Sequence, residues 1–291
     1  MAPDAPSLLL GLIGQGIGGS LTPALHQAEG EAQGLRVLYQ LIDLAALRLG
    51  PEALPELVLA AQRMGFAGLN ITFPCKQAVL PLLDELSEEA RALGAVNTVL
   101  LHGGRRVGHN TDGAGFAEGF RRGLGDAPRA RVVQLGAGGA GVAVAQALLA
   151  ERAGRLALHD VAPGRAADLA ARLCGRFGEG RAAVAGDLAE EVAAADGLVN
   201  CTPVGMRGRP GLPLPAALLH PRLWVAEVIY VPLETELLRA ASALGCRTLG
   251  GGGMAVFQAV GAFRLFSGRE PDPARMAAHF ARLVSGAARA G

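Results

Sequence analysis

Strand-like and helix-like segments alternate along the middle of this chain, and this alternation limits the folds open to it. Helical segments such as 139–149 and 165–173 separate short apolar runs typical of buried strands, which lie at 131–135, 155–159, 181–185, 197–200 and 223–228. Strands that alternate with helices form a parallel sheet with helices on both faces. The sequence therefore predicts a doubly wound α/β domain in this part of the chain.

A glycine-rich turn follows the first of these strands and opens the helix behind it. Residues 136–141 match the pattern G-x-G-x-x-G. The first glycine allows a tight turn, the second lets the backbone approach a pyrophosphate, and the third lets the helix pack against the strand. The helix start offers N–H groups and a positive dipole end to phosphates. We therefore predict dinucleotide binding by Gly136, Ala137, Gly138, Gly139, Ala140 and Gly141.

The second strand of this domain ends in a carboxylate, Asp160, which lies 19 positions beyond Gly141. An acidic residue near that spacing accepts hydrogen bonds from the adenosine ribose. The same carboxylate repels a 2′-phosphate, and residues 161–164 place no arginine directly beside it. Arg165 lies farther along and is interpreted as a helix-surface residue. The sequence favours NAD over NADP as the cofactor.

The first third of the chain also alternates between strand and helix signals. Strands are predicted at 8–13, 37–42 and 66–72, helices at 22–31 and 51–64, a helix that follows Pro74 and ends at Leu83, and a hairpin at 95–108. A helix at 114–122 precedes a segment with glycine and proline, 123–129, which is the best linker candidate. After four glycines at 250–253, two more helices are predicted at 254–266 and 273–287.

Lysine is used only once in the chain. Of the 27 basic side chains, 26 are arginines, and Lys76 is the only lysine. A lysine can exchange a proton near neutral pH when its pKa is lowered, whereas an arginine stays protonated. Because Lys76 follows Asn70 and Thr72 at a strand-to-helix turn, we predict a functional site there. The alternative is a solvated lysine beside a helix cap, with no further role.

Other polar side chains stand where helices are predicted to begin. Ser20 and Thr22 open the first helix, where hydroxyls and N–H groups suit an anion. Asn97 follows an apolar stretch, and Asp112 follows the hairpin. Thr22 and Asp112 also fit as ordinary helix caps, and in that interpretation neither needs a ligand.

The composition argues against several other classes of protein. A formal net charge of +1 argues against a nucleic acid as the main partner. The longest apolar runs, 8–13 and 142–150, are too short to span a bilayer. Residues 1–7 have no basic residue before the apolar run, unlike a secretion signal. The four cysteines and six histidines show no metal-binding spacing. We expect a cytoplasmic chain with neither a metal nor a membrane partner.

Six motifs, taken together and in order, resemble the shikimate dehydrogenase family. They are GGSLTP at 18–23, NITFPCK at 70–76, GAVNT at 94–98, NTDG at 110–113, the glycine-rich turn at 136–141, and TPVGM at 202–206. The resemblance covers nearly the whole chain. It is closest to the quinate/shikimate dehydrogenase branch, which residues 230–238 and 258–259 also resemble.

The resemblance implies a role for each matching residue. Lys76 and Asp112 match the family's catalytic pair. Substrate binding is implied for Ser20 and Thr22, which match the hydroxyls on the substrate carboxylate, and for Asn70, Thr72, Asn97, Gln258 and Tyr230. The wall beside the nicotinamide is matched by Thr202, Val204, Met206 and Gly253. NADP-dependent members commonly carry Asn-Arg-Thr/Ser where this chain has Asp160-Val161-Ala162, a departure that agrees with NAD.

The resemblance also implies two α/β domains. An N-terminal substrate-binding domain, 1–112, is rejoined by the C-terminal helices at 254–287. A Rossmann-type NAD-binding domain, with a doubly wound parallel sheet, comprises 113–250.

The implied activity is a reversible hydride transfer between NAD and shikimate or quinate, a small polyhydroxy cyclic carboxylate. An NADP-dependent biosynthetic shikimate dehydrogenase, an aminoshikimate dehydrogenase and a methylenetetrahydrofolate dehydrogenase stay open as alternatives. A non-catalytic NAD-binding sensor is an alternative of a different class. A homodimer is compatible with the sequence.

Overall fold

The computed structural model describes residues 7–289, apart from the side chains of residues 163 and 286–289. Residues 1–6, on which the argument against a secretion signal partly rests, lie outside the described residues. The chain divides into two compact units: unit 1 runs to Thr111 and resumes at Val256, and unit 2 is Asp112–Ala255. Asp112, which the sequence grouped with the N-terminal segment, therefore begins unit 2.

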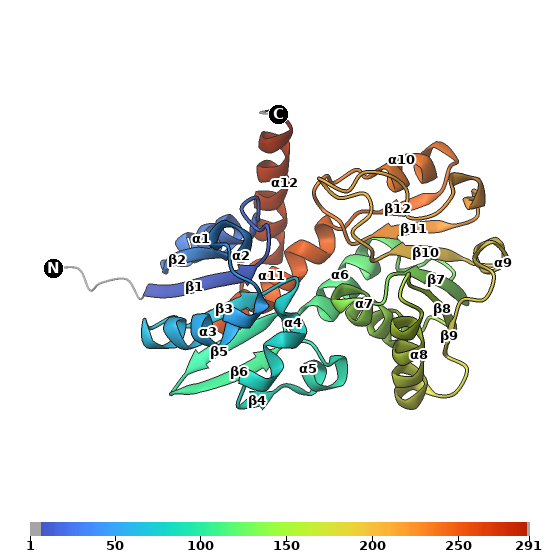
Figure 1. Cartoon of the computed structure of the whole chain (residues 1–291). Coiled ribbons are helices and arrows are strands. Elements are labelled where there is room, and N and C mark those ends of the chain that lie inside the picture. The colour runs from blue at the N-terminus through green and yellow to red at the C-terminus, as the bar shows by residue number, and fades with distance from the viewer. Residues whose placement is uncertain (1–6, 290–291) are drawn as a thin grey trace. The chain divides into compact units, whose positions relative to one another are not determined.

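Unit 1 contains a mixed sheet of six strands (Figure 1). The strand order is β2-β1-β3-β5-β6-β4. The strands are β1 (Ser7–Gly14), β2 (Arg36–Asp43), β3 (Gly68–Ile71), β4 (Glu85–Leu86), β5 (Thr98–His102) and β6 (Arg105–His109). β1 pairs in parallel with β2 and β3, whereas β5 pairs antiparallel with β3 and β6. The predicted hairpin is the β5–β6 pair.

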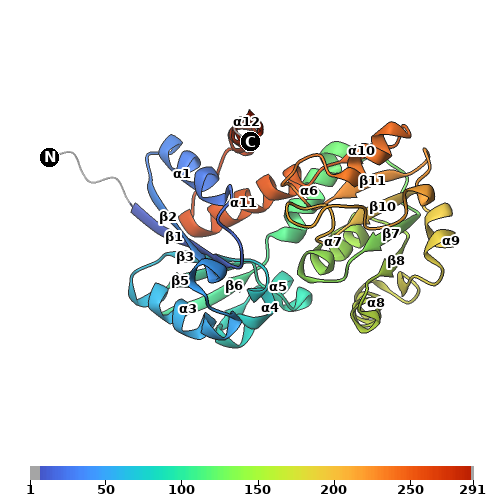
Figure 2. The same cartoon turned by 45° about the horizontal axis from the view of Figure 1, so that its top comes forward.

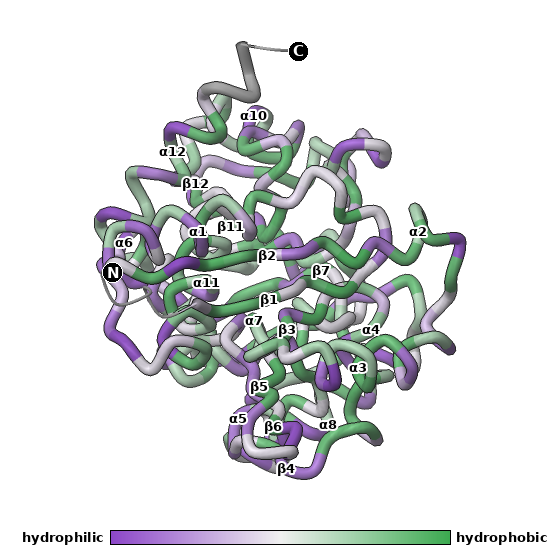
Figure 3. The backbone as a smooth tube through the Cα atoms, turned by 90° about the vertical axis from the view of Figure 1, so that its left-hand side faces the viewer, coloured by the Kyte–Doolittle hydropathy of each residue, from purple (hydrophilic) through white to green (hydrophobic). Residues whose placement is uncertain are grey.

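Helices cover both faces of this sheet because successive residues of β1 point to opposite faces. Leu10 packs with Phe263 and Phe266 of α11 (Gly252–Ser267), whereas Ile13 packs with Leu54 and other residues of α3 (Leu54–Arg63). Figure 3 shows the apolar β1 beside β2. The remaining helices of unit 1 are α1 (Thr22–Ala32), α2 (Leu44–Leu47), α4 (Cys75–Ala78), α5 (Glu88–Leu93) and α12 (Pro273–Arg289), with short 3₁₀ turns at Pro51–Ala53 and Leu80–Leu82.

The helix predicted to run from Pro74 to Leu83 is wrong as a single element. It ends at Ala78 as α4, and a 3₁₀ turn follows at Leu80–Leu82. Pro81 lies inside that turn. A proline in a helix interior lacks the N–H that an α-helix needs there and clashes with the carbonyl four residues earlier.

Unit 2 contains a sheet of six parallel strands in the order β12-β11-β10-β7-β8-β9 (Figure 1). Figure 2 shows β11, β10, β7 and β8 side by side. The strands are β7 (Arg131–Leu135), β8 (Arg155–His159), β9 (Ala182–Val184), β10 (Gly197–Asn200), β11 (Trp224–Glu227) and β12 (Arg247–Leu249). Counted from β7, this is the 3-2-1-4-5-6 order of a dinucleotide-binding fold. The predicted α/β fold with a doubly wound sheet is confirmed.

The order in which the chain adds strands to this sheet reverses between β7 and β10. β8 and β9 follow on one side of β7, and β10, β11 and β12 follow on the other. This is the topological switch point, and ligands of open α/β sheets bind beyond the carboxyl ends of the strands there. The glycine-rich turn follows β7, and the TPVGM segment follows β10. The fold thus brings two of the predicted motifs to one place.

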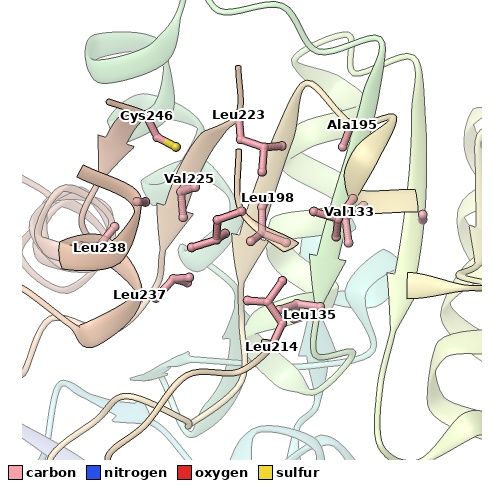
Figure 4. Close-up of a cluster of buried hydrophobic side chains, with 14 of the residues drawn as sticks. Val133, Leu135, Ala195, Leu198, Leu214, Leu223, Val225, Leu237, Leu238 and Cys246 are labelled. Atoms are coloured by element: carbon pink, nitrogen blue, oxygen red, sulfur yellow. The ribbon is translucent and has the colours of Figure 1, made fainter. Parts of the chain in front are cut away.

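The core of unit 2 lies on both faces of its sheet. On one face, Val133, Leu198 and Val225 pack with Leu237 and Leu238 of α10 (Glu236–Ala243) (Figure 4). On the other face, the ring of Trp224 meets Phe120 of α6 edge-on, with 5.2 Å between ring centroids. The helices of unit 2 are α6 (Asp112–Leu124), α7 (Gly139–Ala150), α8 (Pro163–Phe177), α9 (Leu188–Ala193) and α10, with a 3₁₀ turn at Ala216–Leu218.

The segment 123–129 is not a linker between the units. It lies within unit 2, where the indole N–H of Trp224 donates to the carbonyl of Pro128 at 2.7 Å and Ala127 is buried. The composition of the segment indicated a break in secondary structure, and that break is the turn from α6 to β7. Within residues 7–289, no helix is both long and apolar enough to cross a membrane.

Candidate active site

Two glycines of the turn after β7 are needed by the packing of the protein itself. Gly136 has a φ of +94°, and a Cβ there would lie 2.9 Å from the carbonyl oxygen of Cys201. A Cβ on Gly141 would lie 2.2 Å from the carbonyl oxygen of Gly136. Gly138, by contrast, has nothing within 4 Å of its Cβ position. Packing within the described residues therefore does not require glycine at 138. The close approach of a pyrophosphate to the backbone would require it.

Hydrogen bonds of the Gln134 and Asp160 side chains hold the turn in place. The side-chain amide of Gln134 donates to the carbonyls of Gly136 and Gly141, both at 2.9 Å. The carboxylate of Asp160 accepts from the backbone N–H of Ala137 at 2.7 Å and from that of Ala162 at 2.8 Å. Each oxygen of Asp160 accepts one of these bonds, which leaves lone pairs for ribose hydroxyls. The predicted cofactor residue is thus attached to the predicted cofactor loop.

Thr202, Val204 and Met206 lie in the loop after β10. The hydroxyl of Thr202 accepts from the N–H of Val204 at 3.2 Å, and Met206 is 41% exposed. Burial, and then the nearby Glu227, raise the pKa of the Cys201 thiol well above its ordinary value. Cys201 therefore stays protonated and is no candidate nucleophile.

Gly253 and Tyr230 are the other candidates of unit 2. Gly253 lies in the first turn of α11, and a Cβ there would approach the Cα of Gly119 in α6 at 3.3 Å. Close packing of two helices is therefore a reason for this glycine in addition to the predicted nicotinamide contact. Tyr230 is partly buried and follows β11.

In unit 1, three polar side chains form a continuous network where β3 ends and β5 begins. The amide nitrogen of Asn70 donates to the carbonyl of Asn97 and to the hydroxyl of Thr98, both at 3.1 Å. Thr98 donates to the amide oxygen of Asn97 at 2.9 Å. That oxygen also accepts from the N–H of Thr111 at 2.9 Å. The predicted ring-hydroxyl ligands Asn70 and Asn97 are therefore brought together and are both buried.

A tyrosine that sequence reasoning missed completes this network. The hydroxyl of Tyr39, on β2, donates to the amide oxygen of Asn70 at 2.7 Å. His26 packs against the Tyr39 ring with 5.2 Å between centroids, and against Phe263 and Phe266. Both ring nitrogens of His26 are buried without a hydrogen-bond partner among residues 7–289, and burial lowers its pKa to about 3. His26 is therefore neutral and acts as part of the apolar core.

Lys76 is the second residue of α4 and is partly buried. Its backbone carbonyl accepts from the N–H of Val96 at 2.9 Å, next to Asn97. The carbonyl of Thr72 accepts from the N–H of Cys75 at 2.8 Å, which starts the helical turn. These bonds hold the turn that carries Lys76 against the segment that carries Asn97.

Two further candidates lie on helices, Asp112 at the start of α6 and Gln258 inside α11. Asp112 is the first residue of α6 and is 5% exposed, directly after the buried Thr111. Gln258 lies in the part of α11 that belongs to unit 1. Lys76 and Asp112 thus belong to different units.

Thr22 is not the N-cap of α1, so the interpretation of Thr22 as an ordinary helix cap is wrong. Leu21 occupies the cap position without a side-chain hydrogen bond, and the Thr22 N–H donates to the hydroxyl of Ser20 at 3.3 Å. The preceding loop is held by Asp43, whose carboxylate accepts from the N–H groups of Gly16 and Ile17 at 2.8 and 2.9 Å. Helix capping therefore does not account for the Thr22 hydroxyl. This supports the interpretation that Thr22 binds an anion.

Sequence reasoning missed the residues that hydrogen-bond to the candidate site residues or to the loops that carry them. These are Tyr39, Asp43, Gln134, Asn200 and Glu227. All five lie on strands of the two sheets. Except for Asp43, which follows the predicted strand 37–42, the signal was a polar residue within a predicted strand, most clearly Gln134 and Asn200. The partner of such a residue lies on another strand, so the sequence alone does not identify it.

Comparison with known proteins agrees with these features. The family model for the shikimate dehydrogenase substrate binding domain matches residues 12–99. A shikimate dehydrogenase (NADP(+)) of Streptomyces avermitilis is 62% identical over 97% of this chain and 98% of that protein. A quinate/shikimate dehydrogenase (NAD(+)) of Corynebacterium efficiens is 52% identical over 95% of this chain and 99% of that protein.

Among solved structures, the quinate dehydrogenase of Corynebacterium glutamicum in complex with NAD is similar to this chain. The TM-score is 0.89 and the identity 49%, over 95% of this chain and 99% of that one.

Proposed function

Because the chain belongs to the shikimate dehydrogenase family, we propose that it is an NAD-dependent quinate/shikimate dehydrogenase. The observation that carries the proposal is the buried network of Asn70, Thr98 and Asn97 next to the turn that holds the only lysine. A row of amides and hydroxyls suits a ligand with several ring hydroxyls, and buried polar groups of this kind are costly unless they serve hydrogen bonding. Unit 1 is accordingly proposed as the substrate-binding domain and unit 2 as the dinucleotide-binding domain.

The residues of unit 2 fit a nicotinamide dinucleotide. The open backbone at Gly138 and the start of α7 suit a pyrophosphate, Asp160 suits the ribose, and the loop from Thr202 to Met206, with Gly253, suits the nicotinamide. A bound nicotinamide would accept or return the hydride, and the protein supplies orientation and proton transfer.

The chain's own groups divide the remaining work. Ser20 and Thr22 donate to the substrate carboxylate, while Asn70, Thr72, Asn97, Gln258 and Tyr230 hold the ring hydroxyls. Oxidation of an alcohol to a ketone releases a proton together with the hydride. The neutral side-chain amine of Lys76 takes that proton from the reacting hydroxyl and becomes the ammonium, and Asp112 orients the side-chain nitrogen.

An NADP-dependent shikimate dehydrogenase is the second candidate, and the Streptomyces avermitilis relative favours it. The carboxylate of Asp160 favours NAD, because a 2′-phosphate would face it without a compensating cation. Val161, next in sequence, is 96% exposed and carries no charge. Initial rates with shikimate and quinate, each with NAD and NADP, test both candidates.

The expected result is turnover of shikimate or quinate with a higher kcat/KM for NAD than for NADP. Equal or higher efficiency with NADP would reject the NAD assignment, and no turnover of either substrate would reject the activity. The double variant Asp160→Ser, Val161→Arg should shift the preference toward NADP, because it removes the repelling charge and adds a cation.

A further inference from the structure

A buried carboxylate lies directly beneath the loop that follows β10. Glu227 is the last residue of β11, is 2% exposed, and has no part in the proposed reaction. It stands opposite Asn200, the last residue of β10, which is fully buried. A buried charge is costly unless it is well compensated by hydrogen bonds.

Among the residues that the structure describes, the hydrogen-bond donors to Glu227 are all neutral. One oxygen accepts from the N–H groups of Val228 and Ile229 at 3.0 and 3.2 Å. The other accepts from the hydroxyl of Thr235 at 3.2 Å. Both oxygens accept from the amide nitrogen of Asn200, at 3.1 and 3.0 Å. Every hydrogen bond of the carboxylate thus requires it to be an acceptor.

The orientation of the Asn200 amide follows from these contacts. Its oxygen accepts from the backbone N–H of Thr202 at 2.9 Å, and a backbone N–H can only donate. The amide nitrogen must therefore face Glu227. It also donates to the carbonyl of Val204 at 3.0 Å, and the Thr202 hydroxyl donates to the Asn200 oxygen at 2.7 Å. Asn200 thereby holds both Thr202 and Val204.

We infer that Glu227 is a positioning residue for the nicotinamide end of the cofactor: through Asn200 it fixes the loop from Thr202 to Val204 before the cofactor binds. This inference rests on the proposed function, which assigns Thr202 and Val204 to the nicotinamide wall. Glu227 itself touches neither cofactor nor substrate in this role. Its effect is to make the loop a preformed surface, so that less conformational freedom is lost on binding.

The first test uses the full-length enzyme and Glu227→Gln. The substitution keeps the size of the side chain but places an NH₂ group where donors already converge. We expect the Kd for NADH, measured by fluorescence titration, to rise about ten-fold, the effect of roughly one hydrogen bond to a charged group. The KM for NAD should rise in parallel, whereas the KM for shikimate or quinate, whose proposed ligands lie mainly in unit 1, should change less than about two-fold.

Glu236→Gln is the matched control. Glu236 lies at the start of α10, next to Thr235, is exposed, and accepts from the N–H of Gly211 at 3.1 Å. A glutamine retains an acceptor for that bond, so the Kd for NADH and the KM for NAD should stay at their wild-type values. An unchanged Kd for NADH in Glu227→Gln, or an equal rise in Glu236→Gln, would overturn the inference.

Amide hydrogen exchange of the wild-type enzyme without cofactor provides a second test that needs no variant. The N–H groups of Thr202 and Val204 should be protected, because the first donates to the Asn200 side chain and the second to the Thr202 hydroxyl. Exchange at the rate of an unstructured chain would show that the loop is not preformed and would overturn the inference even if Glu227→Gln fails to fold. If the wild type binds neither NADH nor NADPH, the proposed function fails, and protection of these two amides still decides whether the loop is preformed.

Discussion

The side chain of Lys76 is the single group on which the proposed proton transfer depends. Replacing it with arginine keeps the positive charge but removes a group that exchanges protons near neutral pH. We expect Lys76→Arg to lower kcat by about 10²- to 10⁴-fold, the range typical of general acid–base catalysis. The Kd for NADH, measured on the same preparation, should stay near the wild-type value and serves as the control for folding. Turnover within about three-fold of wild type would show that a fixed cation is enough.

The amide of Asn70 is oriented by a backbone carbonyl and a tyrosine. Its nitrogen faces the carbonyl of Asn97, which can only accept, so its oxygen must face the hydroxyl of Tyr39. Both hydrogens of the amide are donated within the network, one to Asn97 and one to Thr98. Asn70 can therefore meet a substrate only as an acceptor, which suits a ring hydroxyl and not a ketone.

Tyr39→Phe tests this orientation. Without the tyrosine hydroxyl, the amide oxygen of Asn70 loses a donor and the amide is free to shift. The KM for shikimate or quinate should rise roughly five-fold, as for one neutral hydrogen bond, with the KM for NAD unchanged. His26→Leu is the control, because it alters the packing on the Tyr39 ring without removing a hydrogen bond. Equal effects of both variants on the substrate KM would show that packing, not the hydroxyl, is responsible.

At the scale of elements, an ion pair between a buried carboxylate and an exposed guanidinium joins α1 to α12. Glu29 on α1 is 1% exposed and accepts from the guanidinium of Arg275 on α12, at 2.7 and 2.8 Å. It also accepts from Gln33 and from the N–H of Asp272 at the start of α12. Burial by itself raises the pKa of Glu29, but the hydrogen bonds from Arg275, Asp272 and Gln33 outweigh it and lower the pKa.

Glu29→Gln should therefore destabilise the contact between these two helices. The glutamine removes one of the two carboxylates beside Arg275, leaving Asp272 at 3.4 Å, and sets an NH₂ group among donors. We expect the free energy of unfolding, from urea denaturation, to fall by about 2 kcal/mol. Glu270→Gln, at an exposed pair with Arg264 in the same unit, is the control and should change it little. If the two variants are equally stable, the Glu29 pair contributes no more than a surface pair.

For the whole molecule, the two units should respond to pH in opposite ways. Burial raises the pKa of Glu227 in unit 2 to about 7, above its ordinary value of 4.5. The folded state then binds more protons than the unfolded state between these values, so unit 2 loses stability as pH rises from 4.5 to about 7, by about 3 kcal/mol. In unit 1, the lowered pKa of Glu29 means that stability is present above the ordinary pKa and is lost on acidification below it.

Hydrogen exchange resolves the two units separately. After correction for intrinsic exchange rates, protection of the β10 and β11 amides should decrease from about pH 5 to about pH 7. Protection of the β1 and β3 amides should instead increase from about pH 5 to about pH 6.5, because burial lowers the pKa of His26 in unit 1 to about 3 and the unfolded chain therefore binds a proton that the folded unit does not. In Glu227→Gln the slope in unit 2 should disappear. A slope shared by both units, or one that survives the substitution, would contradict the assignment.

Much of the site could be predicted from the sequence because its signals are local. The turn at Gly136–Gly141 depends on backbone conformations and close approaches that involve glycine and a strand-to-helix junction, and both are visible in a short stretch of residues. The alternation of strands and helices likewise set the doubly wound fold of unit 2. The helix after Pro74 was predicted too long because the breaking effect of Pro81 was overlooked, although that signal is local as well.

Pairs across strands were decided only by the tertiary structure. Glu227 meets Asn200 because β11 lies beside β10 in register, and Tyr39 meets Asn70 although β1 lies between their strands. Each residue alone is only a polar residue in a strand, and its partner is chosen by sheet order and register, which no local pattern encodes. The sequence by itself thus determined which groups carry the proposed chemistry, whereas the packing of the sheets decided which buried groups hold them in place.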